Sequence, residues 1–171
     1  EKFHGAVVSH AGHEHTRTFQ EVTAVGELLE QLQPVAESVN RAEVGLIYDF
    51  QNEWALELAQ LPRSVDKNYQ KRCIAHYQQF WQQGITVDII DSTFNNLAIY
   101  KLVIAPMLYL LQEGVAELLH DYVRDGGTLV ATYLTGVVDQ SDLVFLGGSP
   151  GPLKELLGIW VEETDVLFDH H

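Results

Sequence analysis

The stretch VGLIYDF at residues 44–50 is the first of four short apolar runs that decide the fold of this chain. The other three runs cover residues 86–91, 102–105 and 128–134. Each run is hydrophobic on both sides, which is typical of buried strands in a parallel sheet. Segments with a helical period separate the runs, and right-handed crossovers then place helices on both faces of the sheet. The sequence therefore predicts an α/β fold with a doubly wound parallel sheet.

Two segments between these runs have the spacing and the caps of helices. Residues 65–83 place their apolar side chains on one stripe, with Ser64 or Asp66 available as the N-terminal cap. Residues 115–122 carry a second stripe, and the glycines that follow favour a helix stop before the last apolar run. Both helices are expected to pack on the sheet.

The two ends of the chain predict further elements. Residues 16–40 have a helical apolar period and form a linking helix that we expect to be broken near Pro34. Residues 152–158 begin with a first-turn proline and end with glycine, which predicts a short helix. Residues 159–161 are apolar and are expected to form a last strand.

The balance of charge argues against nucleic acid and membranes as partners. A formal net charge of −14 repels both phosphate backbones and anionic lipid. The densest basic group, formed by Lys67, Lys71 and Arg72, fits the solvated face of a helix. No apolar run approaches the ~20 residues that a membrane-spanning helix needs. We therefore expect neither nucleic acid nor a membrane as a partner.

Cys73 is the single cysteine, which excludes an intrachain disulfide and suits a reducing compartment, so we expect a cytoplasmic protein. It falls on the apolar stripe of residues 65–83, where a small buried side chain is expected rather than an activated thiolate. The strand ends also lack a nucleophilic cysteine and a Gly-x-Ser-x-Gly elbow. Nucleophilic catalysis within this chain is therefore not expected.

The end of the first strand has the wrong chemistry for a nucleotide. Residues 49–54 contain no glycine to bring backbone amides close to a phosphate, and they carry two carboxylates that would repel it. Asn52 is interpreted there as the N-cap of a helix. We expect no cofactor. Four further acidic residues are interpreted as helix-surface or strand-end groups: Glu53, Glu57, Asp88 and Asp91.

Histidines gather near the start of the chain. His13 and His15, with Glu14 between them, have the right atoms to hold a metal ion if the segment is extended. Neither a strand pattern nor a third ligand accompanies them, so a junction between a loop and a helix is the better interpretation. We expect no metal site.

Several phrases of the sequence resemble glycoside hydrolase family 42 β-galactosidases. They include EKFHG at residues 1–5, SHAG at 9–12, GGTLV at 126–130 and LGGSPG at 146–151. The resemblance implies a flavodoxin-like architecture, similar to class I glutamine amidotransferases, for the family's second domain. It also implies a trimerisation role, because that domain helps to hold three subunits together. The chain begins at Glu1 rather than methionine, so we expect a piece of a longer protein.

The same resemblance assigns parts of the chain. Residues 1–15 correspond to the tail end of the catalytic barrel, where the family's Glu-x-x-His motif contacts galactose, so Glu1 and His4 are substrate-binding residues in the full-length parent only. Residues 16–40 are the linking helix, residues 41–162 the trimerisation domain and residues 163–171 a C-terminal extension. The acid/base and the nucleophile of a retaining glycosidase come from barrel strands that are absent here. We therefore expect no catalytic residue in this chain.

Two functional hypotheses remain open from the sequence. The first is a non-catalytic oligomerisation domain, expected to form a homotrimer, with the aromatic residues Trp54, Phe145 and Trp160 as candidate contacts. The second is an independent small-molecule-binding or hydrolytic α/β domain that uses the crevice at the carboxyl ends of the strands. Three loop glycines either line that crevice or serve turns: Gly136, Gly147 and Gly148.

Overall fold

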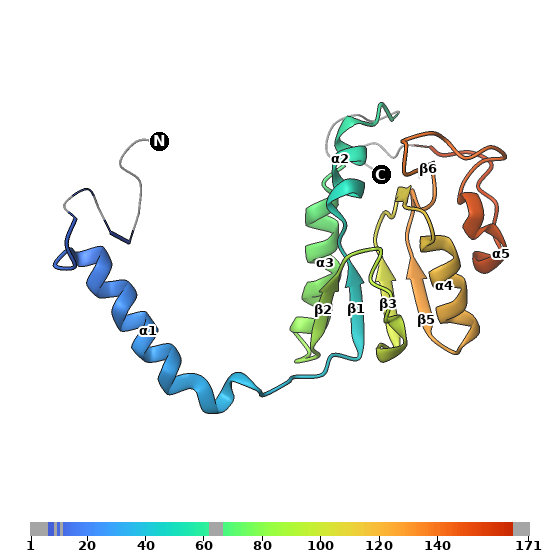
Figure 1. The fold of residues 1–171 in the computed structure, drawn as a ribbon. Helices are drawn as coiled ribbons and strands as arrows, with labels where there is room; N and C mark the ends of the chain where they lie inside the picture. The colour runs from blue at the N-terminus through green and yellow to red at the C-terminus, as the bar shows by residue number, and fades with distance from the viewer. Residues whose placement is uncertain (1–6, 9, 11, 62–66, 166–171) are drawn as a thin grey trace. The chain divides into compact units, whose positions relative to one another are not determined.

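The computed structural model describes residues 7, 8, 10, 12–61 and 67–165, and it divides the chain into two compact units, Glu1–Asn40 and Arg41–His171. The first unit contains α1 (Arg17–Ala36), which begins where the Thr16 hydroxyl accepts a hydrogen bond from the Phe19 backbone N–H at 3.3 Å. Figure 1 shows α1 as one continuous helix. Thr16 thus acts as an ordinary N-cap.

The break predicted near Pro34 is wrong, because α1 continues through Pro34 to Ala36. Pro34 lies in the last turn, so its missing N–H removes one hydrogen bond from a helix that ends two residues later. None of the twenty residues of α1, all of them described, is buried. Its apolar stripe is therefore exposed in this chain, and it consists of Val22, Val25, Leu28, Leu29, Leu32 and Val35.

Removing residues 1–40 is expected to leave the stability of the second unit unchanged. The reason is that the second unit has two hydrophobic cores of its own, and both consist of residues of that unit alone. Thermal unfolding of the chain that begins at Arg41 is the measurement. A fall in Tm of more than about 4 °C, which corresponds to roughly 1 kcal/mol for a domain of this size, would contradict this expectation.

The second unit is built on a four-stranded parallel sheet. Its strands are β1 (Val44–Ile47), β2 (Val87–Ile90), β3 (Leu102–Ala105) and β5 (Thr128–Ala131), in the order β2-β1-β3-β5. The four apolar runs all form strands, and the run at 102–105 has the predicted bounds. The other three strands end earlier than predicted, because turns and a helix cap use the residues that follow.

Helices follow two of these strands. They are α2 (Phe50–Leu58) and α3 (Tyr69–Trp81) after β1, and α4 (Val115–Arg124) between β3 and β5. The start of α3 differs from the prediction, since Asn68 occupies the N-cap position and its side chain makes no capping hydrogen bond. The predicted caps Ser64 and Asp66 lie outside the described residues. Figure 1 shows α3 beside β2 and β1, and α4 beside β5.

Smaller elements complete the unit. A second sheet pairs β4 (Leu110–Leu111) with β6 (Val138–Asp139), also in parallel. Two 3₁₀ turns are also present, at Leu97–Ile99 and Gly151–Leu153, and the second leads directly into the short helix α5 (Lys154–Leu157). The strand predicted at 159–161 is wrong, because those residues have no strand pairing apart from a single bond from Val161 N–H to the Ser149 carbonyl.

Side chains that alternate along β1 enter two separate hydrophobic cores. Leu46 packs in the core that contains α2 and α3, whereas Ile47 packs with α4 in the other core. β3 alternates in the same way, because Val103 and Ala105 join the core of Ile47. Helical cores on both sides explain why these strands are apolar at every position.

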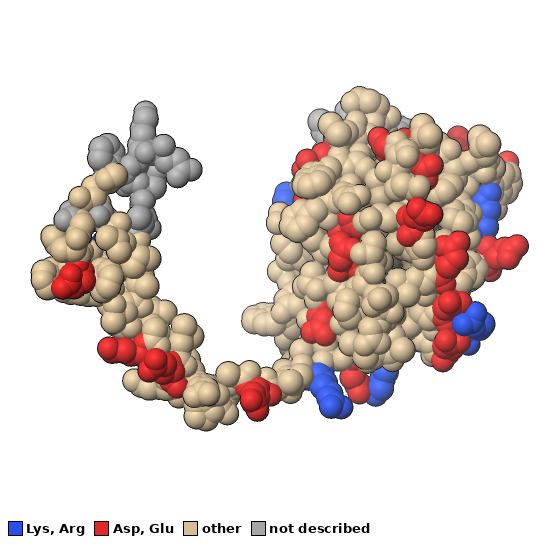
Figure 2. Space-filling model, in the orientation of Figure 1, with Lys and Arg blue, Asp and Glu red and all other residues tan. Residues whose placement is uncertain are grey.

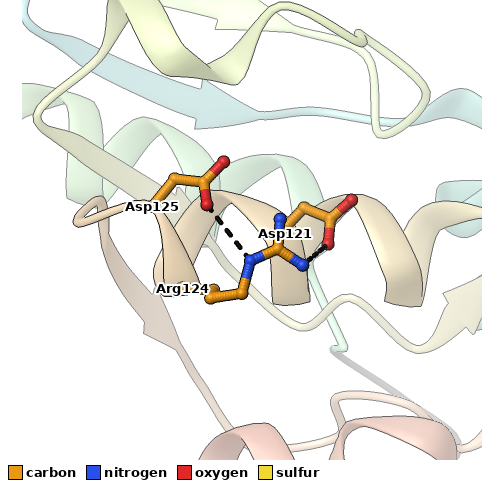
Figure 3. Close-up of polar contacts among 3 residues, drawn as sticks. All are labelled: Asp121, Arg124 and Asp125. Atoms are coloured by element: carbon orange, nitrogen blue, oxygen red, sulfur yellow. Dashed lines mark hydrogen bonds and ion pairs between the residues drawn. The ribbon is translucent and has the colours of Figure 1, made fainter.

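The surface of the second unit is rich in acidic side chains. Figure 2 shows carboxylates spread over the visible face, with few basic residues among them. At the end of α4, Arg124 donates to Asp121 at 2.5 Å and to Asp125 at 3.1 Å (Figure 3). The hydrogen bond to Asp125 and the charge of Asp121 raise the pKa of the guanidinium. Among the described residues, no helix combines the length and the apolar character needed to cross a membrane.

Candidate functional site

The carboxyl ends of β1 and β2 meet at Asp49, which is fully buried. One carboxylate oxygen accepts the backbone N–H groups of Gln51 (2.8 Å) and Asn52 (3.1 Å), which makes Asp49 the N-cap of α2. The other oxygen accepts the Ser92 hydroxyl and the Gln112 side-chain amide, the latter at 2.8 Å. Every acceptor position of this carboxylate thus faces a donor of the same chain.

Asn52 is not the N-cap of α2, which corrects the sequence prediction. It lies inside the first turn and is fully buried. Its side-chain amide donates to the Met107 carbonyl at 3.0 Å, and its carbonyl oxygen accepts the Leu110 N–H at 2.9 Å. This pair of bonds ties α2 to the segment after β3. Polar groups of the chain therefore occupy the place where a parallel sheet would bind a ligand.

The three loop glycines serve turns rather than a binding crevice. Gly136, Gly147 and Gly148 all have positive φ, at 64°, 86° and 85°. A Cβ on Gly136 would lie 2.3 Å from the Pro150 carbonyl oxygen, so two backbone segments pack directly against each other there. Such contact leaves no room for a ligand beside Gly136.

The four acidic residues near the strand ends have structural surroundings rather than a shared site. Glu53 accepts the Tyr48 hydroxyl at 2.7 Å, and Asp88 accepts the Tyr100 hydroxyl at 3.0 Å. Burial, with a further contribution from Asp88, raises the pKa of Tyr100 to about 12. Asp91 accepts from the backbone and the hydroxyl of Thr93 in a turn, and Glu57 lies exposed on α2. The structure brings no two of these carboxylates together as a catalytic pair among the described residues.

Cys73 is buried in the core formed by α2 and α3, as the sequence predicts. Burial raises the pKa of its thiol to about 11. We expect the folded chain to react with iodoacetamide at pH 8 far more slowly than the unfolded chain, because the thiolate is the nucleophile. Mass spectrometry of the alkylated chain with and without urea measures the two rates. Equal rates would contradict the buried position.

The histidines near the start of the chain form the predicted loop-to-helix junction. The backbone N–H of His15 donates to Nδ1 of His13 at 3.2 Å in the turn that leads into α1. This local hydrogen bond therefore occupies one ring nitrogen of His13. No group of three possible metal ligands occurs within the described part of the chain. Glu1 and His4, predicted to contact substrate in a longer parent, lie outside the described residues.

Exposed apolar side chains are the remaining candidates for function. Trp54 is 57% exposed on α2, and Trp160 is 62% exposed after α5. Phe145 is less accessible, because its side chain packs against the core around α4. Its ring also lies so close to Gly151 that a Cβ at that position would be 2.5 Å from the ring. The sequence analysis did not identify the two exposed neighbours of Trp54 on α2. These are Phe50, which is 60% exposed, and Leu58, which is 75% exposed.

An open apolar groove of about 370 Å³ lies between α3 and the strands β1 and β2. Its lining is almost wholly hydrophobic and consists of Leu46, Tyr48, Gln70, Cys73, Ile74, Tyr77, Val87 and Ile89. The apolar residues of α3 and β2 that line the groove are visible in the sequence. Their spacing does not indicate, however, that α3 leaves Ile89 exposed. A groove with few polar side chains and no charged one in its lining is suited to hydrophobic contact rather than to chemistry.

Comparisons with known proteins agree with this reading of the site. A family model described as the β-galactosidase trimerisation domain matches residues 42–171. The chain is 52% identical over 169 residues to β-galactosidase BglY of Alicyclobacillus acidocaldarius. This alignment covers 99% of this chain and 24% of that protein. It is also 52% identical over 171 residues to β-galactosidase Pbg of Clostridium perfringens, again with 99% and 24% coverage.

Solved structures give the same result. The β-galactosidase from Rahnella sp. R3 aligns with a TM-score of 0.78 at 48% identity, over 100% of this chain and 25% of that one. Gan42B, a GH42 β-galactosidase, aligns with a TM-score of 0.76 at 43% identity and the same coverage. This chain thus spans about a quarter of the length of the relatives it matches. The resemblance predicted from the sequence is confirmed, and the chain belongs to the family of β-galactosidase trimerisation domains.

Proposed function

We propose that this chain is the assembly part of a longer β-galactosidase and that it associates with copies of itself as a homotrimer. The observation that carries the proposal is the match of residues 42–171 to a trimerisation domain. The closed strand ends support it, because Asp49 and Asn52 use their polar atoms within the chain. The strand order β2-β1-β3-β5 further supports a flavodoxin-like classification.

The activity of the parent is part of the same proposal. The relatives are β-galactosidases about four times as long as this chain, so hydrolysis of terminal β-galactosides is proposed for the parent and not for these 171 residues. Glu1 and His4 are proposed to contact the galactoside there, within a barrel tail at residues 1–15. The linking helix at 16–40 and the assembly domain at 41–162 follow, then an extension at 163–171. A single buried cysteine supports a cytoplasmic location.

Sedimentation velocity of the chain across a wide concentration range tests the assembly role. We expect the sedimentation coefficient to rise with concentration toward that of three chains. A coefficient that stays at the monomer value up to the highest concentration would overturn the proposed self-association. Assays with a chromogenic β-galactoside on the same samples should show only the rate of the buffer, since the catalytic pair of a retaining enzyme belongs to the barrel.

A further inference from the structure

We propose that the exposed face of α2, together with Tyr48 and the groove between α3 and β2, is the surface through which one copy of this chain contacts the next. The inference rests on the self-association proposed above and names its place. The surface has a convex part, called here the α2 ridge (Phe50, Trp54 and Leu58), and a concave part, the α3 groove lined by the residues given above.

The α2 ridge is an apolar stripe that the fold leaves uncovered. Its three residues are spaced four apart, so they lie on one face of the helix, and each is more than half exposed. The buried residues of the helix are Asn52, Ala55 and Leu56, and they lie on the opposite side. Exposed aromatic side chains at this spacing are unusual on an isolated monomer and are enriched in protein contacts.

Both ends of the ridge helix are fixed, which makes the ridge rigid before any partner binds. Asp49 caps the first turn from a buried position. At the other end, the Lys67 ammonium donates to the backbone carbonyls of Ala59 at 2.6 Å and Glu57 at 3.3 Å. A preformed surface loses little conformational entropy on association.

Tyr48 joins the ridge to the groove. Its ring stands edge-on to Phe50 with centroids 5.4 Å apart, and it also lines the groove. Two further groove residues, Ile74 and Ile89, are about half exposed. Ridge and groove therefore form one continuous apolar surface with a convex and a concave part. A cyclic assembly with heterologous contacts needs two such complementary surfaces, since the ridge of one copy meets the groove of another.

The size of the surface favours another protein chain as its occupant. Taking about 200 Å² for an aromatic side chain, the exposed fractions of Phe50 and Trp54 leave roughly 230 Å² of aromatic surface. Leu58, which is 75% exposed, extends the ridge further. The ridge alone thus supplies a substantial apolar part of the roughly 800 Å² that each partner contributes to a stable interface.

Charge favours a second copy of this chain over an unrelated partner. α2 carries Glu53 and Glu57 with no basic residue, whereas α3 carries Lys71 and Arg72 with no acidic residue. Copies with a formal net charge of −14 repel each other over most of their surface. The ridge of one copy set against the α3 groove of the next instead brings acidic and basic helices together. This complementarity orients the two copies as well as attracting them.

Sedimentation of matched tryptophan variants tests the surface. Trp54→Gln removes the centre of the ridge, and Trp160→Gln removes a tryptophan of nearly equal exposure elsewhere on the same unit. We expect Trp54→Gln to weaken self-association at least about tenfold, the scale of a central aromatic contact, and Trp160→Gln to leave it unchanged. Thermal unfolding by circular dichroism confirms that both variants fold. Equal association of Trp54→Gln and wild type would overturn the inference.

Disulfide trapping tests the pairing of ridge and groove directly. A chain with Leu58→Cys is mixed with a chain with Ile74→Cys and oxidised, and a mixed disulfide between the two is expected. The native Cys73 is buried and does not compete. The control mixes Trp160→Cys with Ile74→Cys and should give no mixed species. A mixed species in the control alone, or in neither mixture, would overturn the inference.

Different results would overturn the proposed self-association and the proposed contact surface. A wild-type chain that stays monomeric at every concentration overturns self-association, and the contact surface with it. A wild-type chain that associates, with Trp54→Gln associating equally well, overturns only the surface described here. A small apolar ligand as the true occupant of the groove would give the latter result.

Discussion

Replacing Asp49 with alanine is expected to destabilise the second unit by roughly 4 kcal/mol, a large part of the total stability of a domain of this size. The substitution removes the N-cap of α2, which alone is worth about 1 kcal/mol. It also leaves the buried Ser92 hydroxyl and the half-buried Gln112 amide without their carboxylate acceptor, and a buried unsatisfied group costs about 1–3 kcal/mol. Urea unfolding followed by circular dichroism measures the change.

Asp91→Ala is the matched control for this result. Asp91 also follows a strand of the sheet and accepts a backbone N–H two residues on, but its side chain is exposed. Its loss should cost no more than about 1 kcal/mol. Asp49→Asn should fall between the two, because the amide oxygen still caps α2 while its NH₂ group faces the donors of Ser92 and Gln112. A similar urea midpoint for Asp49→Ala and Asp91→Ala would contradict the role assigned to the buried carboxylate.

Gly136→Ala is expected to destabilise the second unit by about 3 kcal/mol or more. The new Cβ would lie 2.3 Å from the Pro150 carbonyl oxygen, and a backbone atom cannot move away as the tip of a side chain can. Overpacking of this kind costs typically about 1–3 kcal/mol. The φ of 64° at this position adds roughly 1 kcal/mol for a residue with a side chain. The free energy of unfolding in urea is again the measurement.

Gly158→Ala separates the two contributions to that cost. Gly158 has the same φ of 64°, but a Cβ there would meet no atom within 4 Å. Only the backbone strain should remain, so a loss of about 1 kcal/mol is expected. If both alanine variants lose the same amount, steric contact with Pro150 contributes nothing and the close approach of the two segments is not rigid.

The parallel sheet was predictable because its strands are apolar on both sides, a pattern that follows from having a core on each face. The role of Asn52 was not predictable. Its partners Met107 and Leu110 lie 55 and 58 residues away, and no local pattern records such a contact. β4 and β6 were missed for another reason, since strands of two residues have no period.

The exposure of the α2 ridge could not be predicted from the spacing of its residues. The spacing of Phe50, Trp54 and Leu58 is visible in the sequence, and it equally fits a stripe that packs into a core. Only the structure shows that the helix turns Ala55 and Leu56 inward and leaves the aromatic residues outside. Recognition of the family did not require the structure, because the motif phrases extend through most of the chain.

The position of β1 in the sheet has a consequence for synthesis on the ribosome. β1 is made first but pairs on both sides with strands made later, β2 and β3, and β5 joins the sheet after them. Both edges of β1 can be paired only after residues 48–105 have been made, which at bacterial or eukaryotic translation rates takes roughly 3 to 12 s. During that interval the unpaired edges of β1 are open to other nascent chains on the same polysome.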